Sequence, residues 1–485
     1  MSKRKSIVEN FLFNFILNAS KFIFPLITYP YVARILLPEG TGKVTFATSI
    51  IYYFIMFAEL GIPQYGIRKC AMDQDDQNRL TKTVHELMMI QSVTTVIAYA
   101  ALFGCISSIP KLAEEKTLYF VISAGLLLHL VGVEWLYKAL EEYRYISVRS
   151  LTFKVISVIA MFLFVRQKED YVIYGAITII ASSASYILNF IRARKIISFR
   201  WMGNYNLRQH VKPVLVFFAM ACAVSIYSHI DTLMLGFLKG DVEVGYYNAA
   251  VKVKSILVSV LTSLSVVLLP RASYYLTKGK VEEFEDISRK SMSFSALLSV
   301  PLAVFFILYA EQAVAFLAGS SYAPAVIPMQ LIMPSLCMIA MSYPLGIQIL
   351  VPLGKEKIVL YSEIAGAIVN ILVNLLLIPR FGAAGAAVSN VCAEATVLMV
   401  QFSVVRKEVR SVLGEICWWK VIAAVVVGIG LTVWLKSLEL NVFWMLMLSG
   451  ASFFAVYGIV LALLKERMLA ETVNYVLRKI LSKRK

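Results

Sequence analysis

Long uninterrupted apolar runs, separated by short polar connectors, follow one another along the whole chain. A helix needs about 20 apolar residues to cross the hydrocarbon core of a bilayer, and about fourteen runs approach or exceed that length. Their bounds are roughly 11–36, 42–67, 83–107, 117–141, 149–166, 171–191, 213–238, 245–270, 290–310, 324–352, 357–378, 383–405, 417–436 and 441–464. Continuous runs indicate helices, because the strands of a membrane β-barrel alternate over about ten residues. The pattern predicts an all-α membrane protein with about fourteen membrane-spanning helices.

Composition and charge agree with this interpretation. Hydrophobic residues make up 59% of the chain and charged residues 16%, whereas soluble domains hold about 45–50% and about 25%. The net charge of +17 comes largely from basic clusters at 1–5, 192–212, 271–290 and 478–485. If the N-terminus is cytoplasmic, all four clusters lie on the cytoplasmic side, as the positive-inside rule requires. We therefore expect both termini in the cytoplasm and no nucleic-acid partner.

An internal repeat divides the chain. Two pairs of segments resemble each other at similar separations, namely 33–50 with 235–253 and 142–177 with 354–387. In the first pair Gly42 corresponds to Gly245. We expect two six-helix lobes related by a pseudo-two-fold axis along the membrane normal, around a central cavity. The predicted divisions are an N-lobe at 1–191, a basic cytoplasmic linker at 192–212, a C-lobe at 213–405, and two additional spans with a basic tail at 406–485.

Signatures of nucleotide, metal and hydrolase chemistry are absent from the sequence. There is no phosphate-binding GxxxxGK[ST] loop, no HExxH metal motif and no GxSxG nucleophile elbow. The predicted extracytoplasmic connectors are too short to house a catalytic domain. We expect a transporter that is not an enzyme and holds no metal or cofactor, with a proton or sodium gradient as the candidate energy source.

Polar residues recur at helical spacing inside several predicted spans. In the first span Asn14, Asn18, Lys21 and Thr28 share one helical face. Other spans carry the carboxylates Glu59, Glu363 and Glu394. Such faces avoid lipid and line either helix–helix contacts or a wet cavity, and the long run in the first span favours the cavity.

Charged residues also lie inside the seventh and eighth predicted spans. Asp231 and Lys252 are each about ten residues from the intervening turn, which places them at similar depth in two antiparallel helices. They form either a buried ion pair or, with Lys254, a site for a proton, a cation or an anionic substrate. Both interpretations stay open.

Prolines and glycines mark candidate hinges. Pro25 and Pro30 predict a bend in the first span. Gly61, Pro63 and Gly66 follow the second span and indicate either a broken, gate-forming end or the start of a loop.

Basic and aromatic residues surround the fourth and fifth predicted spans. Arg144, Arg149 and Lys154 lie at their cytoplasmic mouth, where they either serve topology alone or meet an anionic substrate. Trp135 and Tyr137 are expected in the aromatic belt at the membrane interface.

Four stretches carry a family resemblance. They are "FPLITYPYVARILLPEGTGKVTFA" (24–47), "LGIPQYGIRK" (60–69), "IDTLMLGFLKGDVEVGYYNAAVKV" (230–253) and "LIPRFGAAGAAVSN" (377–390). The chain resembles the multidrug/oligosaccharidyl-lipid/polysaccharide exporter superfamily, in particular bacterial O-antigen and capsule repeat-unit flippases. The resemblance implies alternating access to a central cavity, in the bacterial cytoplasmic membrane. It also implies a substrate in which pyrophosphate joins an oligosaccharide to a polyprenol.

The resemblance also implies roles for residues. Lys21 lies near a position where related flippases place a cation against the pyrophosphate, whereas Thr28 is neutral where some relatives carry another cation. The candidate cavity residues are Lys21, Asn14, Asn18, Thr28, Arg34, Lys252, Lys254, Arg144, Arg149 and Lys154. The candidate coupling or ion-pair residues are Asp231, Glu59, Glu363 and Glu394.

Three alternatives remain at this point: a flippase for the peptidoglycan lipid precursor, a cation-coupled drug exporter, and a membrane glycosyltransferase or polymerase. The expected partners are the lipid-linked oligosaccharide, the bilayer, and a polysaccharide polymerase with its assembly proteins. The flippase itself is expected to be a monomer.

Overall fold

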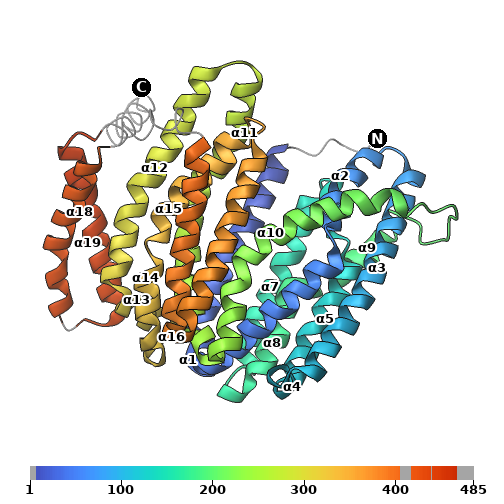
Figure 1. Ribbon diagram of the computed structural model, residues 1–485, viewed down its shortest axis with the longest axis horizontal. Helices are drawn as coiled ribbons and strands as arrows, with labels where there is room; N and C mark the ends of the chain where they lie inside the picture. The colour runs from blue at the N-terminus through green and yellow to red at the C-terminus, as the bar shows by residue number, and fades with distance from the viewer. Residues whose placement is uncertain (1–6, 405–416, 439, 467–485) are drawn as a thin grey trace. The chain divides into compact units, whose positions relative to one another are not determined.

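A computed structural model shows how these runs fold (Figure 1). It describes residues 7–404, 417–438 and 440–466, without the side chains of 7–12, 14, 15, 18, 21, 22 and 223–228. All regular elements in the described ranges are helical, so the predicted all-α fold is confirmed. Nine of the described helices are long and apolar enough to span a membrane, or ten if the bent pair Ser320–Ile332 and Ser335–Leu350 forms one span. The count of fourteen and the pseudo-symmetry stay predictions.

The chain divides into two compact units, 1–245 and 246–485, and the sequence-based lobe boundaries stay predictions. The helices of the first unit are α1 (Ile7–Glu59), α2 (Ile62–Asp73), α3 (Gln77–Ser108), α4 (Pro110–Glu114), α5 (Lys116–Gly132), α6 (Glu134–Ala139), α7 (Tyr143–Phe164), the 3₁₀ turn η1 (Lys168–Asp170), α8 (Tyr171–Ile179), the π-helical turn η2 (Ile180–Ala184), α9 (Tyr186–Ala193) and α10 (Arg208–Lys239). Helix α11 (Asp241–Thr277) begins in this unit and continues into the second.

The helices that follow α11 belong to the second unit. They are α12 (Val281–Leu308), α13 (Ala310–Ala318), η3 (Ser320–Ala325), α14 (Val326–Ile332), α15 (Ser335–Tyr343), the π-helical turn η4 (Pro344–Leu350), α16 (Glu356–Val404), α18 (Trp418–Thr432), η5 (Val433–Ser437) and α19 (Val442–Leu463). Helix α16 breaks at Gly382, whose φ of 53° suits a glycine. Its two halves fold back on each other, because the Ser389 hydroxyl donates to the Asn370 carbonyl at 2.7 Å.

Helix α1 contains the first two predicted spans, joined at a sharp bend. Leu37 has φ 59° and ψ 178°, and Pro38 follows it. A residue before proline avoids the α conformation, so the chain turns here and the second half of α1 runs back along the unit (Figure 1). At its other end α1 stops at Glu59, and Gly61, with φ 75°, starts α2. The sequence left two alternatives at this place, a broken end of the second span and the start of a loop, and its assignment as a gate stays a prediction.

The two glycines matched by the internal repeat lie in direct contact. A Cβ atom on Gly42 would overlap the backbone carbonyl of Asp241, and one on Gly245 would overlap the carbonyl of Pro38. The turn of α1 and the turn between α10 and α11 therefore approach backbone to backbone. Only glycine permits this approach, as in other close helix contacts in membranes.

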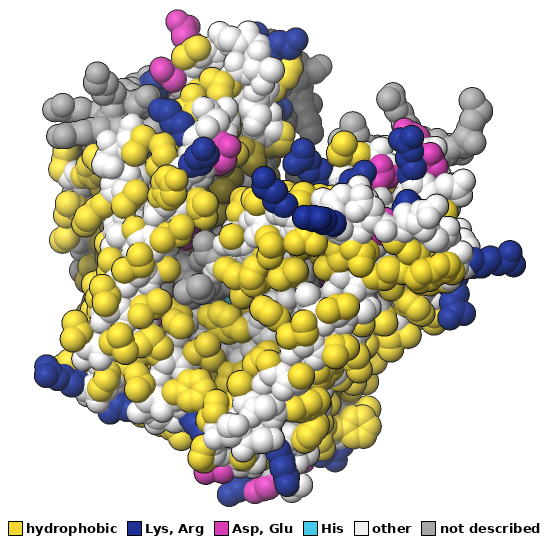
Figure 2. Space-filling model, turned by 45° about the vertical axis from the view of Figure 1, so that its right-hand side comes forward, with side chains coloured by type: hydrophobic (Ala, Val, Ile, Leu, Met, Phe, Trp, Pro, Cys, Tyr) yellow, Lys and Arg dark blue, Asp and Glu magenta, His cyan; other side chains and the backbone are white. Residues whose placement is uncertain are grey.

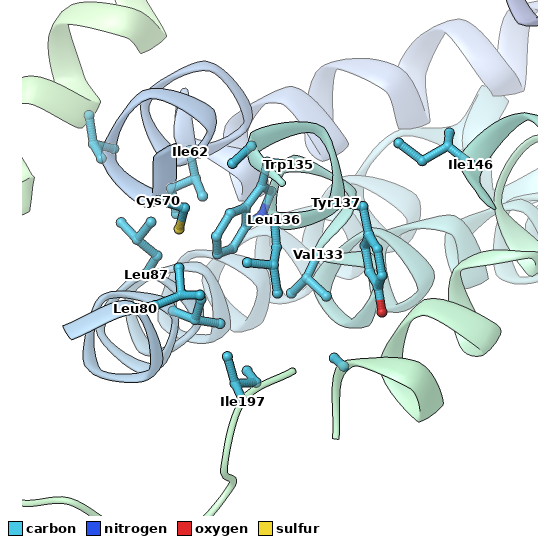
Figure 3. Close-up of a cluster of buried hydrophobic side chains, with 14 residues drawn as sticks. Ile62, Cys70, Leu80, Leu87, Val133, Trp135, Leu136, Tyr137, Ile146 and Ile197 are labelled. Atoms are coloured by element: carbon cyan, nitrogen blue, oxygen red, sulfur yellow. The ribbon is translucent and has the colours of Figure 1, made fainter. Parts of the chain in front are cut away.

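A hydrophobic cluster joins α2, α3, α6 and α7 at one end of the first unit (Figure 3). Trp135 and Tyr137 are its largest members, with 5% and 0% of their surfaces exposed. The Trp135 ring packs on Gly66, and the Tyr137 hydroxyl donates to the Asn189 carbonyl at 2.6 Å. The expectation that these two aromatics sit in the interfacial belt is therefore wrong. Both residues follow the short helix α5, and their side chains point into the unit.

The basic segment between α9 and α10 is attached to α3 through two buried residues. The His85 imidazole contacts the Ser198 carbonyl at 2.7 Å and the Tyr205 hydroxyl at 2.8 Å. The neighbouring Glu86 carboxylate accepts from the Asn206 N–H and from the His210 Nε2, both at 2.7 Å. We call these contacts the linker clamp.

The outer surface fits a bilayer. On the face shown in Figure 2, hydrophobic side chains cover the middle, and Lys and Arg gather towards the two ends. Large exposed apolar residues are numerous on the described helices, for example Leu376 and Met399 at 70% exposure. A surface of this kind is stable in lipid and would aggregate in water. The protein is thus a multi-pass membrane protein.

The glycine contact predicts a position-specific loss of stability. Gly42→Ala forces the two turns apart and should lower the free energy of unfolding by about 1–3 kcal/mol, as overpacking does. Gly104→Ala is the matched control, because no atom lies within 4 Å of its added Cβ. It should be neutral or stabilising by up to about 1 kcal/mol. Thermal unfolding of both purified variants in detergent measures the difference, and equal behaviour would contradict the close contact.

The linker clamp predicts a second loss of folding stability. Glu86→Ala leaves His210 buried without its acceptor and should cost about 3–5 kcal/mol. Asp286→Ala removes an exposed ion pair to Lys290 (2.7 Å) and should cost about 0–1 kcal/mol. The same thermal measurement compares them. A Glu86→Ala protein as stable as the Asp286→Ala protein would show that the clamp contributes little.

Candidate functional site

A cavity of about 360 Å³ lies within the first unit. It is lined by Thr48, Ile51, Tyr52, Ile55, Met56, Glu59, Gly61, Pro63, Gln64, Ile122, His129, Ile179, Ser182, Ser183, Tyr186 and Ala221. These residues come from α1, α2, α5, α8, η2, α9 and α10. Thr48, Tyr52 and Glu59 come from the second half of α1 and contribute polar groups to the lining.

Glu59 and His129 form the charged centre of this cavity. The His129 Nδ1 donates to the Glu59 carboxylate at 2.7 Å, and the Nε2 lies 3.3 Å from the Ser183 hydroxyl. Both side chains are about one quarter exposed. The serine hydroxyl accepts from a protonated imidazole and donates to a neutral one. The arrangement therefore keeps its hydrogen bonds in both protonation states of His129.

The two serines reach the cavity through a local change of helix type. Residues Ile180–Ala184 form the π-helical turn η2 between α8 and α9. Such single turns insert one extra residue into a helix and often occur at functional sites. Here the turn brings Ser182 and Ser183 to the cavity lining.

A second charged group lies behind the cavity wall. The Tyr186 ring meets the His129 ring edge-on, with centroids 5.1 Å apart, and the Arg149 guanidinium lies 5.3 Å from the same tyrosine. Arg149 is buried and donates to Glu134 at 2.8 Å. In this structure its charge is therefore balanced by Glu134, while Arg144 is exposed.

Two of the basic candidates, Lys154 and Arg34, lie near or on the first half of α1. Lys154, from α7, donates to the buried Ser20 hydroxyl at 2.6 Å and lies over the Phe24 ring. Arg34 is exposed and donates to the Pro30 carbonyl at 2.6 Å. Thr28, Pro25 and Pro30 are partly buried along the same helix. The side chains of Asn14, Asn18 and Lys21 lie outside the described residues.

The second unit has its own polar cluster between α11 and α16. The Lys254 ammonium donates to the Asn390 side chain at 2.6 Å and lies 3.8 Å from the Glu394 carboxylate. Asn370 and Asn374 are fully buried and bond to each other at 3.1 Å. This bond lies within the first half of α16, and the second half contacts it where the Ser389 hydroxyl donates to the Asn370 carbonyl.

The remaining candidates belong to different units of the chain. Asp231 is buried in the first unit. Lys252 and Glu363 are partly buried in the second. The predicted ion pair between Asp231 and Lys252 joins two units and stays a prediction.

Ion pairs close the end of the first unit where α1 bends. Lys43 pairs with Glu115 at 2.9 Å and with Glu39 at 3.0 Å. Lys111 pairs with Asp241 at 3.4 Å and also donates to the Gly236 carbonyl. The sequence analysis missed these pairs, because their members come from three turns that are far apart in the sequence.

The sequence analysis also missed His129 and Ser183. His129 is the sole histidine of its predicted span, and Glu59 is an acid that needs a partner in an apolar helix. This need for a partner was the signal in the sequence that could have led to His129. The π-helical turn that delivers Ser183 leaves no recognisable mark in the sequence.

Comparisons with known proteins agree with the fold. A relative from Escherichia coli (strain K12), named "Putative O-antigen transporter", is 25% identical over 410 residues, which cover 84% of this chain and 98% of the relative. The solved structure of the lipid II flippase MurJ, in an inward closed conformation, superposes with a TM-score of 0.75 at 14% identity, over 94% of this chain and 98% of that one. An inward-facing multidrug resistance MATE family transporter superposes with a TM-score of 0.64 at 11% identity, over 83% of this chain and 99% of that one.

Family models complete the assignment. The model described as MatE matches residues 217–376, and the one described as polysaccharide biosynthesis protein matches residues 7–276, more than half of the chain. The resemblance found in the sequence is thereby confirmed, and the chain is a transporter and not an enzyme. The chain belongs to the polysaccharide biosynthesis protein family.

Proposed function

We propose that the protein moves an oligosaccharide, joined through pyrophosphate to a polyprenol, from the cytoplasmic to the outer leaflet of the bacterial cytoplasmic membrane. The observation that carries this proposal is the cavity inside the first unit, which holds the Glu59–His129 pair and two serines although the surface of the protein is hydrophobic. Sugars and a diphosphate cross hydrocarbon only at great cost, which a hydrated interior removes. The prenyl tail stays in lipid.

Family and relatives support this substrate class. The family model concerns polysaccharide biosynthesis, and the E. coli relative is named for O-antigen transport. MurJ is named for lipid II, which makes a peptidoglycan lipid precursor the second candidate substrate. Vesicles holding the purified protein and one of the two lipids distinguish these substrates by the rate at which each lipid becomes accessible outside.

Alternating access provides the mechanism in this proposal. The glycine contact between Gly42 and Gly245 and the pairs Lys43–Glu115 and Lys111–Asp241 hold one end of the first unit shut. With the N-terminus in the cytoplasm, the bend of α1 is on the outer side, so this end is the outer gate. Opening it requires these ion pairs to break, and their side chains, which are only about one fifth to one quarter exposed, must then meet water or substrate.

Proton uptake at the pair Glu59–His129 is the proposed energy coupling. Tyr52, Ser183 and Tyr186 face the pair, with Arg149 and its partner Glu134 behind Tyr186. No charged group other than Glu59 is in hydrogen-bonding contact with His129 among the described residues, so a proton gained there changes the charge of the cavity. A change of that kind biases two conformations against each other.

Lys21 tests the substrate side of the proposal. Charge-assisted bonds from an ammonium to phosphate oxygens are worth about 1.5–3 kcal/mol each, so Lys21→Ala should reduce transport of the lipid-linked sugar by at least about tenfold. Lys21→Arg should keep part of the activity. Lys168→Ala, at an exposed lysine, is the control. Flipping in vesicles is read from the accessibility of the sugar to an added glycosidase. Full activity of a normally folded Lys21→Ala protein would contradict the role.

Glu59 tests the coupling. Glu59→Gln keeps a hydrogen-bond acceptor for His129 but removes the carboxylate, so the stimulation of transport by an imposed pH gradient should disappear while slow transport down a substrate gradient remains. The exposed Glu169→Gln is the matched control. Rates measured with and without the gradient give the answer. A Glu59→Gln protein that still responds fully to the gradient would place the coupling elsewhere.

A further inference from the structure

The segment between α9 and α10 carries large apolar side chains on its outside. Phe199, Trp201 and Met202 are 41%, 76% and 39% exposed. They fall within four consecutive residues, and Arg200 between them is exposed as well. Figure 1 shows this loop projecting sideways from the first unit beside α9 and α3. We call residues 198–204 the tip loop. Apolar exposure as concentrated as this marks an interaction site.

The tip loop has a fixed shape. Gly203 and Asn204 both have positive φ, 70° and 50°, which turns the chain back on itself. The turn places the Tyr205 hydroxyl where it accepts the Met202 N–H at 3.0 Å, and the Tyr205 ring meets the Trp201 ring edge-on at 4.7 Å. The indole is therefore held in place before any partner arrives.

The linker clamp fixes the base of the loop. The Ser198 carbonyl only accepts hydrogen bonds, so His85 donates to it from Nε2 and accepts from the Tyr205 hydroxyl at Nδ1. Ile197, next to the loop, is 2% exposed and packs in the hydrophobic cluster of Figure 3. The base of the loop is therefore buried in the protein, whereas its neighbouring apolar tip is exposed. The tip is the part that is available to a partner.

Charge identifies the chemistry of that partner. Residues 192–212 contain no acidic side chain, and Arg194, Lys195, Arg200 and Arg208 are all exposed. The loop joins the end of one apolar helix group, Lys168–Ala193, to the start of α10, so it lies at a membrane boundary. Tryptophan prefers the head-group level of a bilayer, and exposed Lys and Arg attract anionic lipids.

We propose that the tip loop is a preformed anchor for anionic phospholipids, in which Trp201 and Phe199 enter the head-group region and Arg200 pairs with lipid phosphates. The anchor ties the segment that joins the two predicted lobes to one membrane leaflet. It is independent of which substrate the cavity carries.

The fluorescence of Trp201 tests this anchor. The full-length protein is placed in nanodiscs of phosphatidylcholine or phosphatidylglycerol whose acyl chains carry bromine near the head group. The Trp201 signal is the wild-type emission minus that of Trp201→Phe. We expect bromine to quench it about twofold more strongly in phosphatidylglycerol, with matching protection from aqueous iodide. Arg200→Gln should abolish this lipid preference, and Arg166→Gln, at an exposed arginine outside the loop, should not.

Three outcomes would overturn the proposal. Iodide quenching in both lipids as strong as that of a free indole in water would show that Trp201 stays in water. Equal bromine quenching in both lipids would show apolar insertion without recognition of charge. A Trp201 signal that is shielded only after addition of a cytoplasmic protein fraction would show that the loop binds a protein instead. None of these outcomes bears on transport, so the anchor and the proposed function fail separately.

Discussion

Every charged or polar side chain inside a membrane-spanning protein must find a partner or water, and this constraint organises the structure. An unpartnered polar group in hydrocarbon costs several kcal/mol. The described part of the first unit meets the constraint in two ways. Arg149 and Glu134 neutralise each other in a buried place, whereas Glu59 and His129 pair at the cavity of the first unit, about one quarter exposed. The first pair is buried inside the unit, whereas the second lies at the cavity to which we assign the proposed proton coupling.

The constraint explains how far the sequence alone could be interpreted. Run length and the absence of alternation sufficed for the all-helical fold, because hydrocarbon thickness dictates both. The chain reversals at Leu37 and Gly382 fall in the gaps between predicted spans, and the break at Gly61 is one of the two alternatives that the sequence left open. The repeat match of Gly42 with Gly245 found a real contact, although its meaning became clear only when both backbones were placed together.

Other features depend on long-range packing that local sequence does not encode. Trp135 resembles an interfacial tryptophan by position, yet a short helix turns it onto Gly66. His85 and Glu86 look like ordinary residues at the start of a span, and their partners lie more than a hundred residues away. Glu59, a candidate coupling residue, lines the described cavity, while the candidate cavity residues Arg149 and Lys254 are engaged by acidic or amide partners.

The central claim is that the lipid-linked sugar passes through the cavity between α1, α5 and η2. Thr48 lines this cavity and is exposed. A Thr48→Cys variant, compared with the native chain to subtract its own cysteines, is labelled with a water-soluble maleimide in vesicles. The claim predicts that adding polyprenyl-pyrophosphate-linked oligosaccharide slows labelling at position 48, and that polyprenyl phosphate without sugar protects less. Labelling at an unchanged rate while the same vesicles transport the substrate would show that the sugar takes another path.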